Sequence, residues 1–197
     1  MGLKEDRLKT IEYAKSFGCE LSEEQVWERL ISSTIYKLNP SVRQRRTSPL
    51  DRGEKLKKAR DLTNILSKKF KNILFIGVTG SVATGFPKKN DDIDLLIIVR
   101  NNTLWINRFW VRFFIWKNKI PHRKFNKKEK KDEFCFNIWL DESVLKLPKN
   151  KQNLRNAVDM VLMKKIYDKN DTYLKFIKAN GWAKKFVATP YCSLNLP

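Results

Sequence analysis

One stretch near the middle of the chain constrains the fold more strongly than any other. Two apolar runs, Ile73–Val78 and Ile93–Val99, have the length and composition of buried β-strands. Between them, Gly80 permits a backbone conformation that other residues resist, and Ser81 can cap a helix whose free N–H groups would hold phosphate. The predicted order is therefore a strand, a Gly-Ser turn, a polar loop and a second strand.

Two carboxylates stand at the start of the second run. Because alternate side chains of a strand share a face, Asp92 and Asp94 point the same way, while Ile93 and Leu95 point into the core. Neighbouring carboxylates repel each other unless a cation or a proton lies between them, so a divalent metal ion is their natural partner. An isolated Asp-x-Asp is more often a solvated strand end, but here it follows the Gly-Ser turn. Together the two halves predict a site for a metal-bound triphosphate.

The spacing of these residues resembles a known signature. Gly80-Ser81, ten further residues and then Asp92–Leu95 are similar to the motif of the DNA polymerase beta-like nucleotidyltransferase superfamily, specifically its small bacterial nucleotidyltransferase-domain members. The predicted helix at Lys55–Leu66 and the segment that holds Arg108 resemble the elements that flank this motif. A weaker similarity extends to Leu154–Trp182.

The resemblance implies a metal-dependent chemistry. In that superfamily, two ions, Mg²⁺ or Mn²⁺, are held by three acids and bridge an NTP, so that one polarises the acceptor hydroxyl and the other the leaving pyrophosphate. Asp92 and Asp94 match two of the three acids. Gly80 and Ser81 match the phosphate-binding turn, and Arg108 either contacts the substrate phosphate or pairs with an acidic side chain.

The third acid is where the chain departs from the superfamily pattern. The matching strand is Glu133–Asp141 and the matching catalytic position is Asn137, whose amide offers a metal one neutral oxygen but cannot take a proton. Cys135, on the same strand, is expected at the wall of the site. Two functional classes therefore stay open. One is an enzyme that moves a nucleoside monophosphate from an NTP to a hydroxyl of RNA, protein or a small molecule and releases pyrophosphate. The other is a slow or inactive relative that binds nucleotide and nucleic acid.

The chain is strongly basic. Its 41 Lys and Arg outnumber its 21 Asp and Glu, which gives a formal net charge of +20. Such an excess favours polyanion partners, although a proteome rich in lysine would produce it without any function. The loop over residues 117–131 is the most basic segment, and non-specific nucleic acid is its expected partner. The lysines assigned to this surface are Lys127, Lys128, Lys130 and Lys131.

Cysteine and histidine usage argues against two other classes of protein. Cys19, Cys135 and Cys192 have no paired spacing, and His122 is the single histidine, so neither a disulfide framework nor a zinc site is expected. No apolar run approaches the roughly 20 residues that a bilayer span needs. We therefore expect a soluble, cytosolic protein with no membrane partner.

The pattern and the resemblance together predict an α/β (α+β) fold, in which a small mixed nucleotidyltransferase sheet is flanked by helices. We predict three segments: a helical one over residues 1–50, a nucleotidyltransferase core over 51–148 and a helical segment over 149–197. The first segment has the pattern of two short helices, which is compatible with a winged helix or with a pair of helices packed on the back of the catalytic sheet. Its second helix should begin with a capping box formed by Ser22 and Gln25.

Further expectations concern single elements. The aromatic helix Thr103–Trp116 should be buried on most of its surface, and the strand that carries Asn137 should alternate without interruption. Lys55 should lie on the exposed side of its helix. A helix that begins at Leu154 should extend beyond residue 165, and Ala188–Pro197 should form a loose tail.

Overall fold

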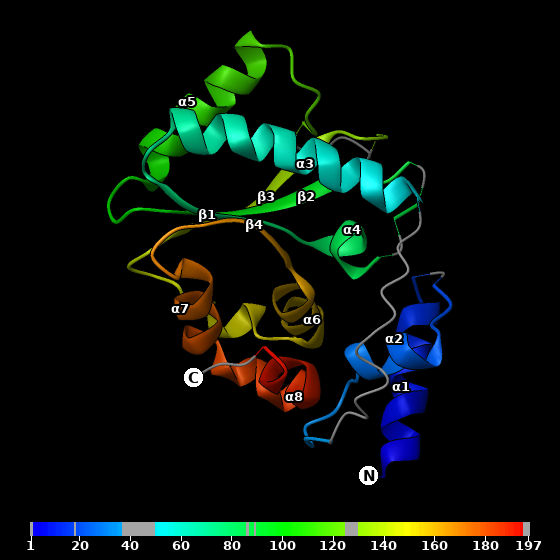
Figure 1. Ribbon diagram of the computed structural model, residues 1–197. Helices are drawn as coiled ribbons and strands as arrows, with labels where there is room; N and C mark the ends of the chain where they lie inside the picture. Colours follow the sequence, from blue (N-terminus) through cyan, green and yellow to red (C-terminus); the bar gives the residue numbers. More distant parts are fainter. Residues whose placement is uncertain are drawn as a thin grey trace. The chain divides into compact units, whose positions relative to one another are not determined.

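The computed structural model describes residues 2–17, 19–36, 50–85, 87–88, 90–124 and 130–194 (Figure 1). The chain divides into two compact units. The helical unit consists of Met1–Thr47, Leu147–Leu162 and Asn180–Pro197, and the sheet unit consists of Ser48–Lys146 and Met163–Ala179. The predicted division into three consecutive segments stays a prediction.

The sheet unit contains a four-stranded mixed sheet, which confirms the predicted fold class. Its strands are β1 (Ile73–Val78), β2 (Ile93–Val99), β3 (Phe134–Asp141) and β4 (Lys164–Asp168), in the order β3-β2-β1-β4. Strand β1 runs antiparallel to both of its neighbours, whereas β2 and β3 are parallel. The two central strands are therefore those that surround the Gly-Ser turn.

Strand β4 was not predicted, because its residues continue the helical pattern of the segment before it. The helix α6 (Leu154–Leu162) ends sooner than expected, and Met163 begins the path back to the sheet. Pairing with β1 then holds the short strand, with Tyr167 opposite Ile76 and Lys164 opposite Val78. Tertiary pairing has here overridden the local helical pattern.

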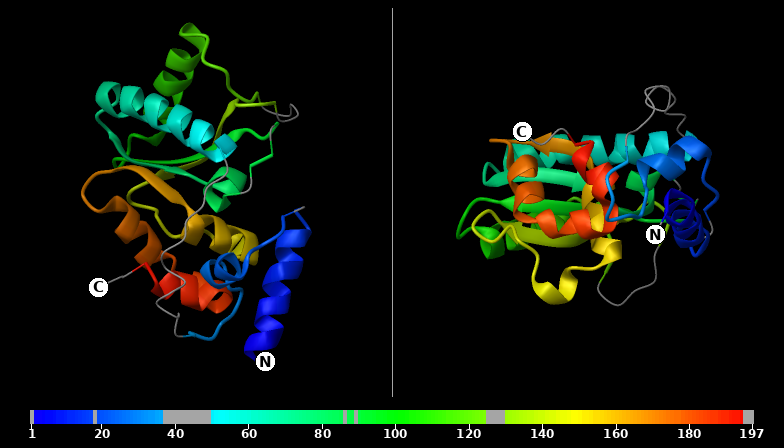
Figure 2. Two further views of the ribbon diagram at one scale, coloured as in Figure 1. Left: turned by 45° about the vertical axis from the view of Figure 1, so that its right-hand side comes forward. Right: turned by 90° about the horizontal axis from the view of Figure 1, so that it is seen from below.

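Helices cover both faces of the sheet (Figures 1 and 2). Helices α3 (Leu50–Lys69) and α5 (Leu104–Lys117) lie on one face, and α4 (Gly80–Thr84) and α7 (Thr172–Ala179) lie on the other. The core under α3 and α5 is apolar. It contains Leu62, Leu66, Ile76, Val78, Ile93, Leu95, Ile97, Val111 and Ile115.

Helix α5 packs on the sheet through one side only. Val111 and Ile115 are buried there, but Trp105 and Trp116 are 76% and 69% exposed. The prediction that this helix is buried on most of its surface is therefore wrong. Its aromatic residues are numerous enough to supply two apolar sides, and only one of them faces the core.

The helical unit joins segments from both ends of the chain. It contains α1 (Leu3–Lys15), α2 (Glu23–Glu28), the 3-10 turn η2 (Lys149–Lys151), α6, the 3-10 turn η3 (Gly181–Ala183) and α8 (Lys184–Cys192). The capping box is confirmed: Gln25 N–H donates to Ser22 Oγ, and Ser22 N–H donates to Gln25 Oε1. The winged-helix interpretation of this region stays a prediction.

The first half of the expected loose tail, residues 188–192, is instead the end of a packed helix. Ser32 forms a parallel bridge with Val187, and Ala188 N–H donates to Ser32 O at 2.8 Å. Residues 187–191 of α8 are buried, whereas residues 195–197 lie outside the described part of the chain. The tail prediction was wrong because partners more than 150 positions away in the sequence supply these contacts. None of the described helices has both the length and the apolar character needed to cross a bilayer.

Candidate active site

The Gly-Ser turn and the start of β2 lie directly against each other. Thr79 N–H donates to Asp94 O at 2.9 Å, which ties the end of β1 to β2. Gly80 follows with a φ of +66°, a conformation that favours glycine. A Cβ added to Gly80 would lie 2.5 Å from Asp94 Oδ2, so the missing side chain leaves room for this carboxylate. Ser81 lies in the first turn of the short helix α4, whose N-cap is Thr79, so the prediction that Ser81 caps this helix is wrong.

Asp92 and Asp94 lie on the sheet face that carries α4, as predicted. Ile93 and Leu95 alternate with them and are buried in the opposite core. Asp92 is only 5% exposed, and Arg123 Nη1 donates to its Oδ2 at 3.2 Å. A buried carboxylate needs such a partner, so Arg123 balances part of the charge that gathers here. No pattern in the sequence had singled out Arg123, because it lies 31 residues from Asp92 in a generally basic segment.

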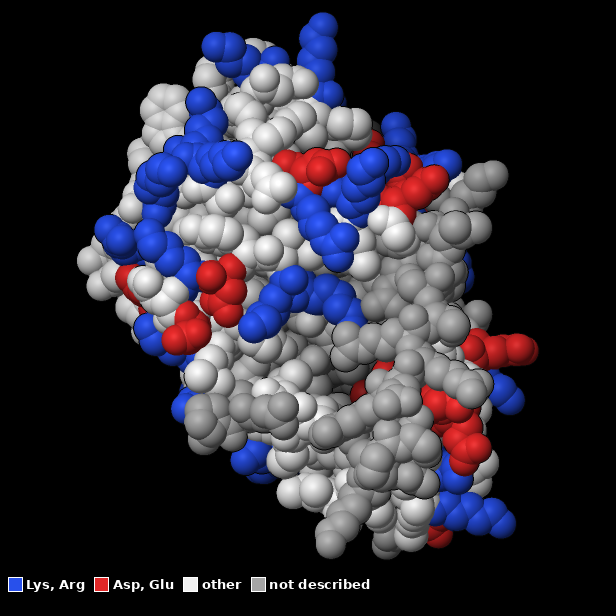
Figure 3. Space-filling model, in the orientation of Figure 1, with Lys and Arg blue, Asp and Glu red and all other residues white. Residues whose placement is uncertain are grey.

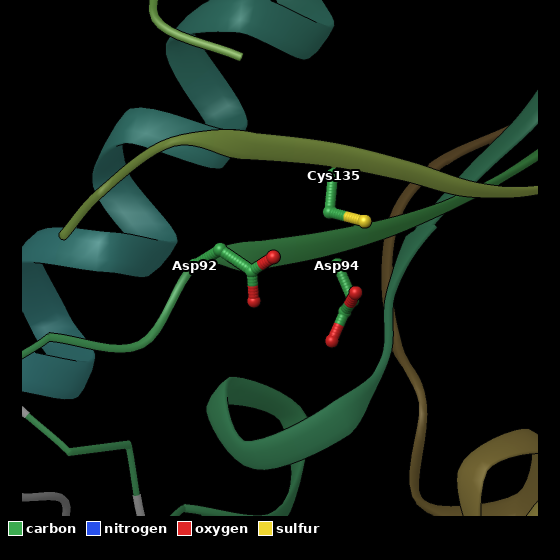
Figure 4. A group of neighbouring side chains, drawn as sticks. All are labelled: Asp92, Asp94 and Cys135. Carbon is green, nitrogen blue, oxygen red and sulfur yellow. The ribbon is translucent and has the colours of Figure 1, made fainter. Parts of the chain in front are cut away.

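The third member of this group is Cys135. Strands β2 and β3 pair in parallel, and the register places Asp94 beside Cys135 (Figure 4). Among the described residues, Asp92, Asp94 and Cys135 offer ligand atoms that all lie within 4.8 Å of one another. The strand order thus gives a thiol the position beside the two carboxylates.

Asn137 does not occupy that position. The pair Asp94 and Cys135 is followed by the pair Leu96 and Ile138, so β3 has one more residue than β2 between these two pairs. Such a bulge interrupts the alternation of the strand. Asn137 lies within this irregular step and is exposed. The expectation of an uninterrupted strand was wrong for this reason, and the catalytic role of Asn137 remains a prediction without support from the register.

The surroundings of Cys135 disfavour its thiolate. Burial, the nearby charges of Asp94 and Asp92 and a hydrogen bond with Asp94 raise the pKa of Cys135 to about 12, against a smaller opposing effect of Arg123. In the absence of a metal ion, the thiol is therefore protonated at neutral pH. This argues against Cys135 as a free nucleophile.

A buried lysine fixes the starts of both strands. Lys55 is 3% exposed, and its Nζ donates to Asp91 O at 2.6 Å and to Asp132 Oδ1 at 2.9 Å. The prediction of an exposed Lys55 was therefore wrong. Lys58 Nζ donates to the other oxygen of Asp132 at 2.7 Å. Partial burial alone would raise the pKa of Asp132, but the hydrogen bonds from the two lysines outweigh it and hold this pKa below its ordinary value.

The two aspartates that Lys55 contacts, Asp91 and Asp132, lie next to the starts of β2 and β3. Asp91 immediately precedes Asp92, the first of the two carboxylates, and Asp132 lies three residues before Cys135. A further backbone bond, from Ile93 N–H to Glu133 O at 2.9 Å, joins the same two segments. The network therefore positions the group of ligands without belonging to it.

The donor atoms fit a single divalent ion. Ligand bonds of about 2.0–2.3 Å place three donor atoms roughly 3–4 Å apart around one ion, so the side chains would rotate to close the observed spread of up to 4.8 Å. Two carboxylates supply negative charge, and a coordinating thiol is deprotonated by the ion itself. A mixed oxygen and sulfur set is softer than a set of three carboxylates, so it suits Mn²⁺ or Zn²⁺ better than Mg²⁺.

The remaining predicted site residues are not brought to this group. Arg108 lies on α5, across the sheet from the two carboxylates, where its guanidinium stands 5.6 Å from the ring centre of Trp105. A phosphate-binding role for Arg108 stays a prediction that this arrangement does not support. Lys130 and Lys131 are exposed just before β3. Lys127 and Lys128 lie outside the described residues, and the nucleic-acid surface remains a prediction.

The comparison with known protein families agrees with the site. Residues 59–179 match the family described as nucleotidyltransferase domain, a range that runs from α3 through α7 and contains all three members of the ligand group. This match covers more than half of the chain. No curated protein matches the chain.

Proposed function

Because the chain belongs to the nucleotidyltransferase-domain family, as its resemblance to the polymerase beta-like superfamily indicated, we propose that it transfers a nucleoside monophosphate from an NTP to a hydroxyl acceptor. Nucleotidyl transfer is the activity of the family. The acceptor class, whether RNA, protein or a small molecule, belongs to the proposal, as does dependence on a divalent ion.

The observation that carries the proposal is the contact between the Gly-Ser turn and the acid pair. Gly80 leaves its Cβ position to the carboxylate of Asp94, so a phosphate bound at the turn would lie beside the ligand group. Asp92, Asp94 and Cys135 would hold the ion. When bound, the ion would neutralise the triphosphate and stabilise charge on the leaving pyrophosphate.

The reaction is a displacement at the α-phosphorus. The acceptor oxygen forms a bond to this atom, the bond to the bridging oxygen of the β-phosphate breaks, and pyrophosphate leaves with the electron pair. The hydroxyl proton passes to solvent. The residues of the chain contribute by holding the triphosphate in line and by excluding water from the buried side of Asp92.

The alternative function is nucleotide binding with slow or absent turnover. Two observations favour it: Cys135 stands where a third carboxylate would complete the ligand set, and Arg123 already balances the charge of Asp92. Both reduce the negative charge available to a pair of ions. Binding would then persist with a single ion while transfer suffers.

Transfer of a radioactive label separates the two functions. The protein is incubated with each α-labelled NTP, with Mg²⁺, Mn²⁺ or Zn²⁺, and with total RNA, total protein and a small-molecule extract. We expect label in one acceptor fraction and in none of the others. RNase should release the label if the acceptor is RNA, and protease should release it if the acceptor is protein. The variant Asp92→Asn, Asp94→Asn should label no fraction. Bound NTP without any labelled fraction would instead support the alternative.

A further inference from the structure

The outer side of α5 is a continuous apolar surface. Six large side chains there expose between 42% and 76% of their surface. They are Trp105, Ile106, Phe109, Trp110, Phe113 and Trp116. With about 200 Å² per aromatic side chain, the five rings alone expose on the order of 600 Å². This area reaches the upper end of the roughly 300–600 Å² that the largest apolar patch of a typical monomer has, and such patches are often interaction sites.

These six side chains, which we call the aromatic face, form one stripe along the helix. At 3.6 residues per turn they fall within an arc of roughly 140°, directly opposite the side on which Val111 and Ile115 are buried. The rings contact one another along the stripe: Phe109 lies 5.4 Å from Trp110, and Trp110 lies 5.9 Å from Phe113. The stripe is therefore a coherent surface and not a set of isolated side chains.

Positive charge borders the aromatic face. Arg108 and Arg112 follow one edge of the arc and Lys117 lies near the other, while α5 contains no Asp or Glu. The sequence from Arg100 to Lys124 holds seven Lys and Arg and no acid at all. Around α5 in Figure 3, the visible charged side chains are those of Lys and Arg.

We propose that the aromatic face of α5 binds the surface of an anionic lipid bilayer, with the helix lying parallel to the membrane. Trp and Phe on one side and Lys and Arg beside them are the composition of helices that lie in the interfacial region. Indole rings favour the depth of the lipid headgroups, and each nearby cation gains from anionic lipid. The net charge of +20 attracts the whole chain to such a surface.

The sequence predicted no membrane partner, because no apolar run is long enough to span a bilayer. Binding of α5 to a bilayer surface departs from that prediction. A helix that lies on the surface needs neither the length nor the uniform apolar character of a span. The 14 residues of α5 are sufficient for it.

Two other occupants fit the surface less well. A second copy of the chain would place the two rows of arginines and two charges of +20 close together, which opposes association. Single-stranded nucleic acid would need open ring faces on which bases can stack. Here two neighbouring pairs of rings meet edge to face at 77° and 87°, the pair Phe113 and Trp116 is tilted by 39°, and Arg108 lies near the ring of Trp105. The rings therefore do not form a row of parallel faces on which successive bases could stack.

Co-sedimentation of the full chain with vesicles tests the proposal. The vesicles contain phosphatidylcholine alone or phosphatidylcholine with about 30% phosphatidylserine, a fraction that gives a clearly negative surface. The variant Trp105→Ser, Phe109→Ser, Trp116→Ser changes the aromatic face. The control, Leu8→Ser, Ile35→Ser, Val144→Ser, removes three apolar side chains elsewhere that are each more than half exposed. Circular dichroism and thermal melting check that both variants fold.

We expect binding to the anionic vesicles, a loss of about tenfold or more in the aromatic-face variant and no loss in the control. Arg112→Gln, Lys117→Gln should weaken binding by roughly 30-fold, since each of the two cations near the surface contributes about 1 kcal/mol. Weak binding to neutral vesicles is expected.

Three outcomes would overturn the proposal. The first is an absence of binding to anionic vesicles. The second is equal binding by the aromatic-face variant, which would assign the attraction to net charge alone. The third is a different occupant: a dimer, or a complex with single-stranded RNA, that the aromatic-face variant loses while vesicle binding stays unchanged.

Discussion

The two faces of strand β2 carry opposite kinds of side chain. Ile93, Leu95 and Ile97 point into an apolar core under α3 and α5, and each is fully buried. Asp92 and Asp94 alternate with them and point to the face that carries α4. The apolar core and the carboxylates of Asp92 and Asp94 therefore lie on opposite sides of the same strand.

The comparison shows how the charged group stays in place. Repulsion between two adjacent carboxylates would spread a flexible segment, but the apolar residues between them fix the strand in a packed core. The core thus stabilises the fold and holds the ligands together at the same time. Substitutions near the carboxylates should change metal and nucleotide binding or transfer, whereas substitutions that loosen the starts of β2 and β3 should lower the stability of the fold.

The largest effect is expected from Gly80→Ala. The added Cβ would meet the carboxylate of Asp94, and the residue would keep a φ that alanine disfavours. A displacement of the carboxylate by about 1 Å should lower the transfer rate by about 100-fold. Transfer of labelled nucleotide measures it.

Gly53→Ala is the matched control. A Cβ at Gly53 meets nothing within 4 Å, and the residue lies in α3, where alanine favours the helix. Its transfer rate should equal that of the unchanged protein. If Gly80→Ala proves as active as this control, the contact between the turn and Asp94 has no role in the reaction.

The next effect concerns Lys55, which holds the starts of β2 and β3. Lys55→Met should lower the free energy of unfolding by about 2 kcal/mol, less than for a fully buried pair because Asp132 is partly exposed. Lys58→Met, on the exposed side of the same carboxylate, should cost less than about 1 kcal/mol. Denaturant unfolding measures both changes. Equal losses of unfolding free energy in the two variants would show that Lys55 contributes no more than the exposed Lys58.

The same network predicts a pH dependence. The pKa of Asp132 lies below the ordinary value of 3.8 in the folded protein, so its stabilising contribution is present above that pH and is lost as pH falls through the folded-state pKa. The stability difference between the unchanged protein and Lys55→Met should therefore shrink below pH 3.8. A difference that stays constant down to pH 2 would contradict it.

A smaller effect should come from completing the acidic set. Cys135→Asp places a third carboxylate beside Asp94, so affinity for Mg²⁺ should rise by about tenfold, while preference for Zn²⁺ over Mg²⁺ should fall. Metal titration in the presence of an NTP measures both. Asn137→Asp should leave both affinities nearly unchanged, because Asn137 is exposed within the bulge. The reverse result would show that Asn137, and not Cys135, faces the ion.

The smallest effect is expected from the two exposed lysines before β3, and it concerns RNA binding. Lys130→Gln, Lys131→Gln should lower the salt dependence of RNA binding by at most about 2 in the slope of log K against log salt, since each phosphate contact contributes about 0.7–0.9. NTP affinity should not change. An unchanged slope would place the nucleic-acid surface on other residues.

The sequence predicted the parts of this site that depend on local patterns. Two strands around Gly80 and the shared face of Asp92 and Asp94 followed from alternation and from glycine chemistry, and the structure has both. The family match confirmed the resemblance that these residues suggested.

Contacts between distant segments could not be predicted in this way. The bulge that brings Cys135 beside Asp94 depends on how two strands pair, and a one-residue shift leaves no mark in a single sequence. The ion pair of Arg123 with Asp92 and that of Lys55 with Asp132 join residues 31 and 77 positions apart. The exposed side of α5 was missed because an aromatic pattern does not say which side meets the core.

Calorimetric titration of the protein with each NTP tests the central claim most directly, that Asp92 and Asp94 form a metal-dependent nucleotide site. The titrations are made with Mg²⁺ or Mn²⁺, with EDTA, and with the variant Asp92→Ala, Asp94→Ala. Because the two carboxylates repel a triphosphate unless a cation neutralises them, we predict that at least one NTP binds only with a divalent ion and that the variant does not bind it. Equal affinity in EDTA, or full affinity in the variant, would contradict the account.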